Sequence, residues 1–441
     1  MRRAGLLVDV RSLPRGERPG DLRRNALRFI DTMADLGLSI WQILPLNPVD
    51  SVGSPYASRS ACAIDPSLHA ALAGDFEAEQ RDVLAALDQH EWLRRSAVFE
   101  ALRDEHGAPW TAWPEEARWS GQDLSAPVDP ERVLHHASVQ LTLHRAWREL
   151  HHAASARRVV VVGDLPLYVA ADSVDVWSAP HLFHLDEQGH PTQRAGVPPD
   201  IFSDTGQLWG NPVYNWDAHV AEGFAWWKQR VARLADLMDV VRIDHFIGVV
   251  RAWSIPAEAP DARTGAWIDA PGPALMAALD EVPVGFIAED LGLVTPEVDA
   301  LRNAHGLLGM AVHQFGFGAE PFSPHTPSMT PEDVVAYPGT HDNDTVLGWW
   351  NNAEETTRER AREAGVTDEH PHVDLIRLGL KSAARWYIAP LQDVLGLPSE
   401  ARMNTPATVG PHNWTWRATP EQVTNEGLLW YAMAAHEAGR V

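Results

Sequence analysis

Short apolar runs of strand length recur along the chain, and most of them are apolar at consecutive rather than alternate positions. They lie at residues 5–10, 39–46, 158–169, 240–246, 286–292, 310–315, 334–337 and 386–391. A strand that is apolar on both faces is typical of a parallel sheet covered by helices. The eight runs therefore predict a sheet that is buried on both sides.

Helical stretches separate many of these runs. Clear examples are residues 21–36, 216–238 and 420–438. The last has apolar residues at helical spacing, and we expect it to close the ring against the first strand. Eight strands alternating with helices predict an α/β fold, a (β/α)8 or TIM barrel that forms a single catalytic domain over residues 1–441.

The spacing between the strands is uneven, which predicts insertions into this barrel. The interval between the second and third runs is too long for a simple crossover, so residues 51–130 are expected to form an inserted subdomain, with helix in 74–106. Residues 184–215 are rich in Gly, Pro and Asp and predict a lid-like loop insertion at the carboxyl side of the third strand. Residues 256–273 and 317–331 are interpreted as irregular surface loops.

Composition narrows the classes of partner and compartment. The chain of 441 residues has 36 basic and 60 acidic side chains, a net charge of −24 that would repel nucleic acid and anionic membranes. Its one cysteine, Cys62, leaves no internal disulfide or thiolate zinc site. The sequence has no secretory apolar segment and no run of membrane-spanning length, so we expect a cytoplasmic protein without membrane or nucleic-acid partners.

Three acidic residues follow predicted strands and are candidates for one active site. They are Asp244 in RIDHF, Glu289 in IAEDLG and Asp342 in YPGTHDND. In a (β/α)8 barrel, catalytic groups stand at the carboxyl ends of different strands, so acids far apart in sequence share a pocket. Cleavage of a glycosidic bond with retention needs such a group: one carboxylate attacks the anomeric carbon and a second carboxylic acid protonates the leaving oxygen.

The neighbours of two of these acids favour different roles. Arg242 lies two residues before Asp244, so on a strand both side chains point to one face, and the guanidinium would keep the carboxylate ionised. Glu289 follows the apolar run GFIA, an environment that raises a carboxyl pKa, whereas Asp290 alternates to the opposite face and is expected to be structural.

In this order, the motifs of the chain resemble those of the amylomaltase, or 4-α-glucanotransferase, family of disproportionating enzymes with an α-amylase-type barrel. The resemblance runs nearly from end to end. It rests on WQILPL from Trp41, SPYAS from Ser54, GDLPLYVAADSVDVW from Gly163, GVPPDIFSDTGQLWGNPVYNW from Gly196, RIDHFIG from Arg242, IAEDLGLVTPEV from Ile287, YPGTHDNDT from Tyr337, LQDVLGL from Leu391, ARMNTP from Ala401 and NWTWR from Asn413.

The resemblance implies roles for the matching residues. Asp244 would be the nucleophile, Glu289 the general acid and base, and Asp342 the third acid, which holds sugar hydroxyls. His341 and Asp164 would contact the same glucose ring.

Aromatic residues would supply platforms for the apolar faces of the sugars. By the same resemblance, Tyr56 stacks on the glucose at the cleavage point, and Ser54 precedes it in the same loop. Trp209 lies in the lid motif, where the family covers its substrate and limits water. Loss of water from the site favours transfer over hydrolysis.

The chain also departs from the family pattern around the acids. DVRSL from Asp9 replaces the usual HPTSL, and Ala57 stands where a glutamine is common. The loop after Tyr56 is a few residues shorter and ends in ACAIDP, which contains Cys62. Ile247 replaces an arginine and Ala252 a tyrosine. These departures affect the expected chain-length preference and the ratio of transfer to hydrolysis.

We therefore predict a retaining 4-α-glucanotransferase that uses α-1,4-glucans or maltooligosaccharides as donors, with glucose or a second glucan as acceptor, and needs no cofactor and no metal. An α-glucan hydrolase with the same site and a catalytically silent glucan-binding barrel are the alternatives. A metal-dependent hydrolase centred on His341, Asp342 and Asp344 is less favoured, and the histidines of 181–190 match no zinc spacing.

Overall fold

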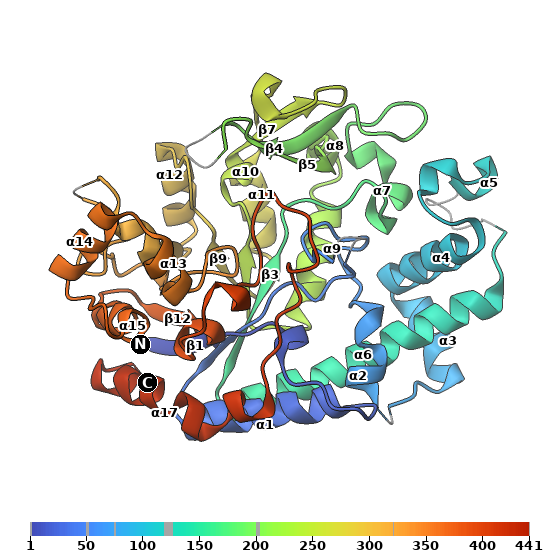
Figure 1. Ribbon diagram of the computed structural model, residues 1–441. Helices are drawn as coiled ribbons and strands as arrows, with labels where there is room; N and C mark the ends of the chain where they lie inside the picture. The colour runs from blue at the N-terminus through green and yellow to red at the C-terminus, as the bar shows by residue number, and fades with distance from the viewer. Residues whose placement is uncertain are drawn as a thin grey trace.

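Eight parallel strands form the centre of the computed structural model, which describes residues 2–49, 53–74, 76–118, 127–199, 203–320 and 322–440. The strands are β1 (Arg3–Leu7), β2 (Ile40–Gln42), β3 (Val160–Leu165), β6 (Val240–Ile243), β9 (Gly285–Ala288), β10 (Gly309–Val312), β11 (Val334–Tyr337) and β12 (Trp386–Pro390). Their order is β10-β11-β12-β1-β2-β3-β6-β9, and a parallel bridge between Ile287 and Leu308 joins the two ends. The predicted (β/α)8 barrel is confirmed, and each predicted run contains or overlaps one strand (Figure 1).

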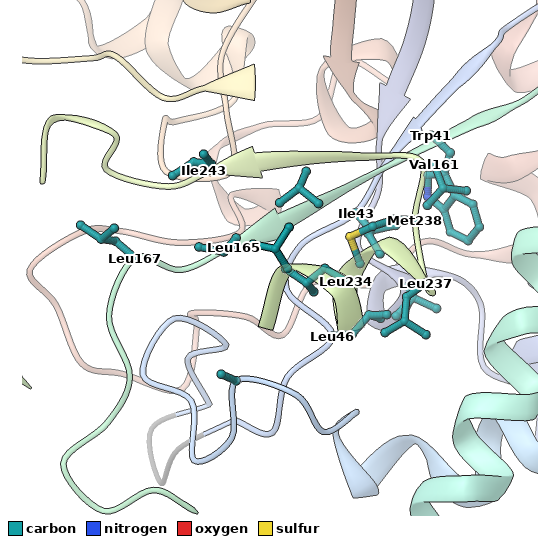
Figure 2. Close-up of a cluster of buried hydrophobic side chains, with 14 of the residues drawn as sticks. Trp41, Ile43, Leu46, Val161, Leu165, Leu167, Leu234, Leu237, Met238 and Ile243 are labelled. Atoms are coloured by element: carbon teal, nitrogen blue, oxygen red, sulfur yellow. The ribbon is translucent and has the colours of Figure 1, made fainter. Parts of the chain in front are cut away.

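The two faces of each barrel strand are buried in different clusters. Val162 of β3 and Ile287 of β9 lie in the cluster inside the ring, whereas Val161 and Ile243 pack outward. Figure 2 shows part of the outward cluster, in which Val161 and Leu165 of β3 lie near Leu234, Leu237 and Met238, and to which Ile243 of β6 also belongs. Alternation along the strand therefore assigns Val162 and Asp164 of β3 to the interior.

Helices cover the outside of the ring and complete the βα repeats. Their bounds are α1 (Asp21–Asp35), α7 (Val174–Ser178), α8 (Trp216–Ala221), α9 (Ala225–Ala235), α10 (Ile247–Val250), α11 (Gly272–Leu279), α12 (Pro296–Ala304), α13 (Val346–Asn352), α14 (Glu355–Glu363), α15 (Pro371–Lys381), α16 (Leu391–Val394) and α17 (Asn425–Glu437). The single helix expected at 216–238 is divided into α8 and α9, because Phe224 has a left-handed φ of 57°. Tyr431 of α17 donates to the carbonyl oxygen of Gly5 in β1 at 2.8 Å, which places the last helix on the first strand as expected.

A helical insertion lies between β2 and β3. It contains α2 (His69–Ala73), α3 (Gln80–Gln89), α4 (Glu91–His106) and α5 (Glu115–Arg118), followed by the long α6 (Pro130–Ala156). Helices α2 to α5 lie in the range 51–130 in which we expected a subdomain, whereas α6 extends beyond it. Residues 51, 52, 75 and 119–126 of that range lie outside the described residues. Helix α6 belongs to both parts, because it packs on α3 and α4 and then joins β3.

A second, antiparallel sheet is built from segments that leave the carboxyl ends of β3 and β6. Its order is β5-β4-β7-β8, with β4 (Gln193–Val197), β5 (Gln207–Pro212), β7 (Arg251–Pro256) and β8 (Ala266–Asp269) (Figure 1). The lid range 184–215 thus contains two strands, although residues 200–202 lie outside the described part. The range 256–273, which we interpreted as irregular, contains β8.

In the described part of the chain, no helix combines the length and the apolar character that crossing a bilayer requires.

Candidate active site at the carboxyl ends of the strands

Strand register brings three of the candidate acidic residues to one rim of the barrel. Asp164 lies in β3 opposite Arg242 of β6, and Asp244 follows the last residue of β6. Ile243 pairs with Ala288 of β9, so Asp244 and Glu289 follow adjacent parallel strands at the same level. The backbone N–H of Glu289 donates to the carbonyl oxygen of Ile243 at 3.0 Å, which continues the pairing to the rim. Asp342 arrives from the loop after β11.

A single guanidinium links two of these carboxylates. Nη1 of Arg242 donates to both carboxylate oxygens of Asp164, at 2.8 and 2.7 Å, and to Oδ1 of Asp244 at 3.1 Å. The Tyr56 hydroxyl donates to Oδ2 of Asp164 at 2.7 Å. Burial alone would lower the pKa of Arg242, but the carboxylates of Asp164 and Asp244 raise it well above its ordinary value. Arg242 is therefore a permanent cation inside the ring.

Burial acts in the same direction on Asp244 and Glu289, but only Asp244 contacts the guanidinium of Arg242. Burial raises the pKa of Asp244 to about 7 and that of Glu289 to about 8, and the charge of Arg242 opposes the rise in both. The side chain of Asp244 remains 27% exposed, so water offsets part of its burial. Glu289 has no direct contact with a cation among the described residues, and its Oε2 accepts the backbone N–H of His245 at 2.6 Å. Of the pair, Asp244 consequently loses its proton first.

Asp290, next to Glu289, points away from this site. Its Oδ1 accepts the backbone N–H of Met310 at 2.7 Å, and its Oδ2 lies 3.4 Å from Nε of Arg302. The alternation of a strand thus directs Asp290 and Glu289 to different surroundings, as the sequence pattern indicated.

An aromatic wall stands beside the acids. The rings of Tyr56 and His341 are stacked, with centroids 5.2 Å apart and planes 8° from parallel. The Trp414 ring is tilted against both, at 5.8 Å from Tyr56 and 5.9 Å from His341. Burial lowers the pKa of His341, so its ring is neutral near pH 7 and can act as donor or acceptor toward a hydroxyl.

Asp342 is held in place but remains accessible. Asn404 donates to its Oδ1 at 2.6 Å, and Nε2 of His341 lies 3.5 Å from its Oδ2. The Asp342 side chain is 46% exposed, so a ligand can reach it. The sequence reasoning did not single out Asn404 or Trp414. Both lie in motifs that carry the family resemblance, ARMNTP and NWTWR, and that was the available signal.

The second sheet is tied to the barrel next to the site. Asn211 donates to the carbonyl oxygen of Val169 at 2.8 Å, and the Tyr214 hydroxyl donates to that of Leu167 at 2.7 Å. Trp209 of β5 is 37% exposed and packs edge to face on His245, with centroids 4.9 Å apart. Ser54 contacts the loop of Tyr56: its hydroxyl oxygen accepts the backbone N–H of Tyr56 at 3.2 Å.

Several residues that depart from the family pattern are buried packing residues and not members of the acidic group. Ile247 and Ala252 are buried apolar residues, 4% and 1% exposed. Asp9 is paired with Arg11, which also reaches Asp65 at 3.2 Å and so joins the loops after β1 and β2.

The structure offers no support for a metal centre at the residues it describes. No group of three or more His, Cys, Asp or Glu side chains there is arranged to hold an ion. Asp344, the third residue of the metal alternative, instead accepts a hydrogen bond from the Ser399 hydroxyl at 2.8 Å.

Known proteins resemble this chain over most of its length. A family model described as 4-alpha-glucanotransferase matches residues 8–86 and 67–422. The chain is 41% identical over 491 residues to a 4-alpha-glucanotransferase of Thermus thermophilus, with 98% of this chain and 97% of that protein covered. It is 37% identical over 482 residues to one of Synechocystis, with 96% and 95% covered.

A solved structure is similar over its whole length. The amylomaltase from Streptococcus agalactiae in complex with acarbose superposes with a TM-score of 0.92 at 29% sequence identity, and each chain is fully covered.

Proposed function

Because the chain belongs to the 4-alpha-glucanotransferase family, we propose that Asp244, Glu289 and Asp342 carry out its glucan transfer at the rim of the barrel. The protein is a 4-alpha-glucanotransferase of the amylomaltase type. The observation that supports these roles best is the contrast between two neighbouring acids: Asp244 contacts Arg242 at 3.1 Å, whereas Glu289 contacts an uncharged N–H.

In the first step, the ionised carboxylate of Asp244 attacks the anomeric carbon of an α-1,4-linked glucose. The bond from that carbon to the glycosidic oxygen breaks, and protonated Glu289 gives its proton to the departing oxygen. A glycosyl ester on Asp244 forms and the shortened glucan leaves. In the second step, Glu289 takes a proton from the 4-hydroxyl of an acceptor, which attacks the ester carbon and releases Asp244. Two inversions at one carbon retain the α configuration.

The surrounding residues bind the reacting glucose. Asp342 and His341 would accept and donate hydrogen bonds at its hydroxyls, and Tyr56 would stack on its apolar face, with Ser54 supporting the Tyr56 loop. Asp164 and Arg242 form an ion pair, and the hydrogen bond from Arg242 would keep Asp244 oriented. No step of this chemistry requires a metal or an organic cofactor, because carboxylates provide nucleophile, acid and base.

The proposed donors and acceptors are maltooligosaccharides, longer α-1,4-glucans and glucose. The range 184–215 would act as a lid in which Trp209 limits the access of water to the glycosyl ester, so that transfer exceeds hydrolysis. The single cysteine fits a reducing compartment, and we place the protein in the cytoplasm.

The test is the product pattern from maltotriose. Transfer gives glucose together with longer maltooligosaccharides at a constant number of reducing ends, whereas a hydrolase increases that number with every turnover. A silent binding protein would give no product. A steady rise in reducing ends that matches glucose release would contradict the proposal.

A further inference from the structure

The backbone around Glu289 is unusual at one residue, His245. This residue has a left-handed φ of 50° although it carries a side chain. A residue with a Cβ enters that region at a conformational cost, and such residues cluster at functional sites. In this conformation its N–H points at Oε2 of Glu289, at 2.6 Å, and the next N–H, of Phe246, donates to the carbonyl oxygen of Glu289 at 3.0 Å. The turn after the nucleophile thus encloses the general acid.

The ring of His245 is held from the other side by the second sheet. Trp209 packs on it edge to face, with planes 89° apart. Gly248 leaves the space for the ring, since a Cβ there would lie 2.8 Å from Cδ2 of His245. Among the described residues, Nε2 of His245 is buried without a hydrogen-bond partner. The ring is therefore positioned by packing and not by a polar contact of its own.

The hydrogen bond from His245 also decides where the proton of Glu289 resides. An oxygen that accepts an N–H is the poorer place for a proton, so in protonated Glu289 we expect the hydrogen on Oε1 rather than on Oε2. The same bond favours the ionised carboxylate and so opposes the rise in pKa that burial causes. The other charges that act on Glu289 are Arg242, Asp244 and Asp290.

We propose that His245 is a positioning residue that transmits the placement of Trp209 to the carboxyl of Glu289. Its ring contacts Trp209 of the lid strand β5, and its backbone N–H holds the carboxyl of Glu289. Glu289 would deliver its proton efficiently only when Trp209 lies against the ring. This inference rests on the proposed role of Glu289 as general acid.

The test compares two donors in the Trp209→Ala and His245→Asn variants and in the double variant. Asn tolerates the left-handed conformation and keeps the N–H, so His245→Asn removes the ring contact alone. With maltotriose we expect kcat to fall about tenfold in each single variant, and the alkaline limb of its pH profile to rise by about half a unit as the bond to Glu289 weakens. The double variant should equal the poorer single variant, because both act through one contact.

The donor α-glucosyl fluoride distinguishes a loss of acid positioning from a defect that lowers activity with every donor. Fluoride leaves without a proton, so single-turnover fluoride release should fall less than about twofold in these variants. Phe322→Ala, which removes a ring that is 81% exposed, serves as the control. It should change neither kcat with maltotriose nor the rate of fluoride release. Equal losses with both donors, an unmoved alkaline limb, or additive effects in the double variant would overturn the proposal.

The Glu289→Gln variant distinguishes a failure of this inference from a failure of the proposed role of Glu289. Glu289→Gln should lose activity on maltotriose and keep fluoride release. If it loses both, Glu289 is not the general acid, whatever the behaviour of His245.

Discussion

At the scale of single residues, Arg242 separates the surroundings of two acids that follow adjacent strands. Its guanidinium contacts Asp164 and Asp244 and leaves Glu289 without a cationic partner among the described residues. The sequence predicted this separation from two facts, the two-residue spacing of Arg242 and Asp244 and the apolar run before Glu289. It did not predict the fixed geometry of Asp342, because Asn404 reaches that acid from 62 positions away along the chain.

The first prediction concerns the nucleophile and the acid. Asp244→Asn should abolish turnover of every donor, because no carboxylate remains to form the glycosyl ester. Glu289→Gln should form the ester from α-glucosyl fluoride but release it slowly, because no base activates the acceptor. Intact-protein mass spectrometry of the Gln variant should detect the adduct, and peptide mapping should place it on Asp244. An adduct on Asp342 would contradict the assignment.

The second prediction concerns pH. The reaction needs Asp244 ionised and Glu289 protonated, so the rate falls as pH drops through the pKa of Asp244 and again as pH rises through that of Glu289. The pKa of Glu289 is raised to about 8 and that of Asp244 to about 7, so kcat/KM for maltotriose should be bell-shaped with both limbs above the range of ordinary carboxyls. A profile without an alkaline limb would remove Glu289 as the acid.

The third prediction gives the geometry that retention requires. In a crystal structure with a bound substrate analogue, the carboxyl groups of Asp244 and Glu289 should face each other at about 5–5.5 Å. A separation of roughly 9 Å would instead fit an inverting enzyme, in which a water molecule stands between acid and base.

At the scale of elements, the barrel strands were predictable and the second sheet was not. Barrel strands such as β3 are apolar on both faces, and this gives a local signal. Strand β4 contains Gly, and β5 contains Gly and Pro. Strand β4 pairs with β5 and with β7, which is distant in sequence: Ala195 pairs with Ser254. Helix α9 lies within the predicted helix, and the break before it falls at Gly223 and Phe224, which both have positive φ; Gly223 was the available signal in the sequence.

The fourth prediction concerns β5 as a lid. Trp209→Ala should raise the fraction of glycosyl ester lost to water, measured as new reducing ends per glucose released from maltotriose. The overall rate can fall as well, so the ratio is the diagnostic quantity. Leu429→Ala, a matched change at an apolar side chain that is 48% exposed on α17, should leave the ratio unaltered. An unchanged ratio in Trp209→Ala would limit that residue to binding or folding.

At the scale of the whole molecule, Arg440 connects segments at the end of the barrel where β1 and β12 begin. It is 1% exposed and donates to the carbonyl oxygens of Leu380, Ala384 and Ser382 at 2.6, 2.9 and 3.0 Å. Arg2 donates to the carbonyl oxygens of Ala438, at 3.2 Å, and of Leu380, at 3.1 Å. These bonds connect the end of α15, the segment that follows α17 and the residue that precedes β1.

The fifth prediction follows from this arrangement. Arg440→Ala should lower the free energy of unfolding by about 3 kcal/mol, because several buried carbonyl groups lose a charged donor. As a control, Arg385→Ala removes an exposed side chain and should change the free energy of unfolding by less than about 0.5 kcal/mol. Urea denaturation with a constant m-value measures both. A loss for Arg440→Ala no larger than that control would show that these bonds contribute little.

Closure of the ring also sets an order of events during synthesis. Strand β1 pairs with β2 on one side and with β12 on the other, and Arg440 reaches the carbonyl oxygen of Arg3 across 437 positions. A nascent chain emerging from the ribosome therefore carries β1 with one unpaired edge until nearly the whole sequence has been translated. Unpaired edges recruit strands from other chains, so partly translated molecules on one polysome are the state of this protein most exposed to aggregation.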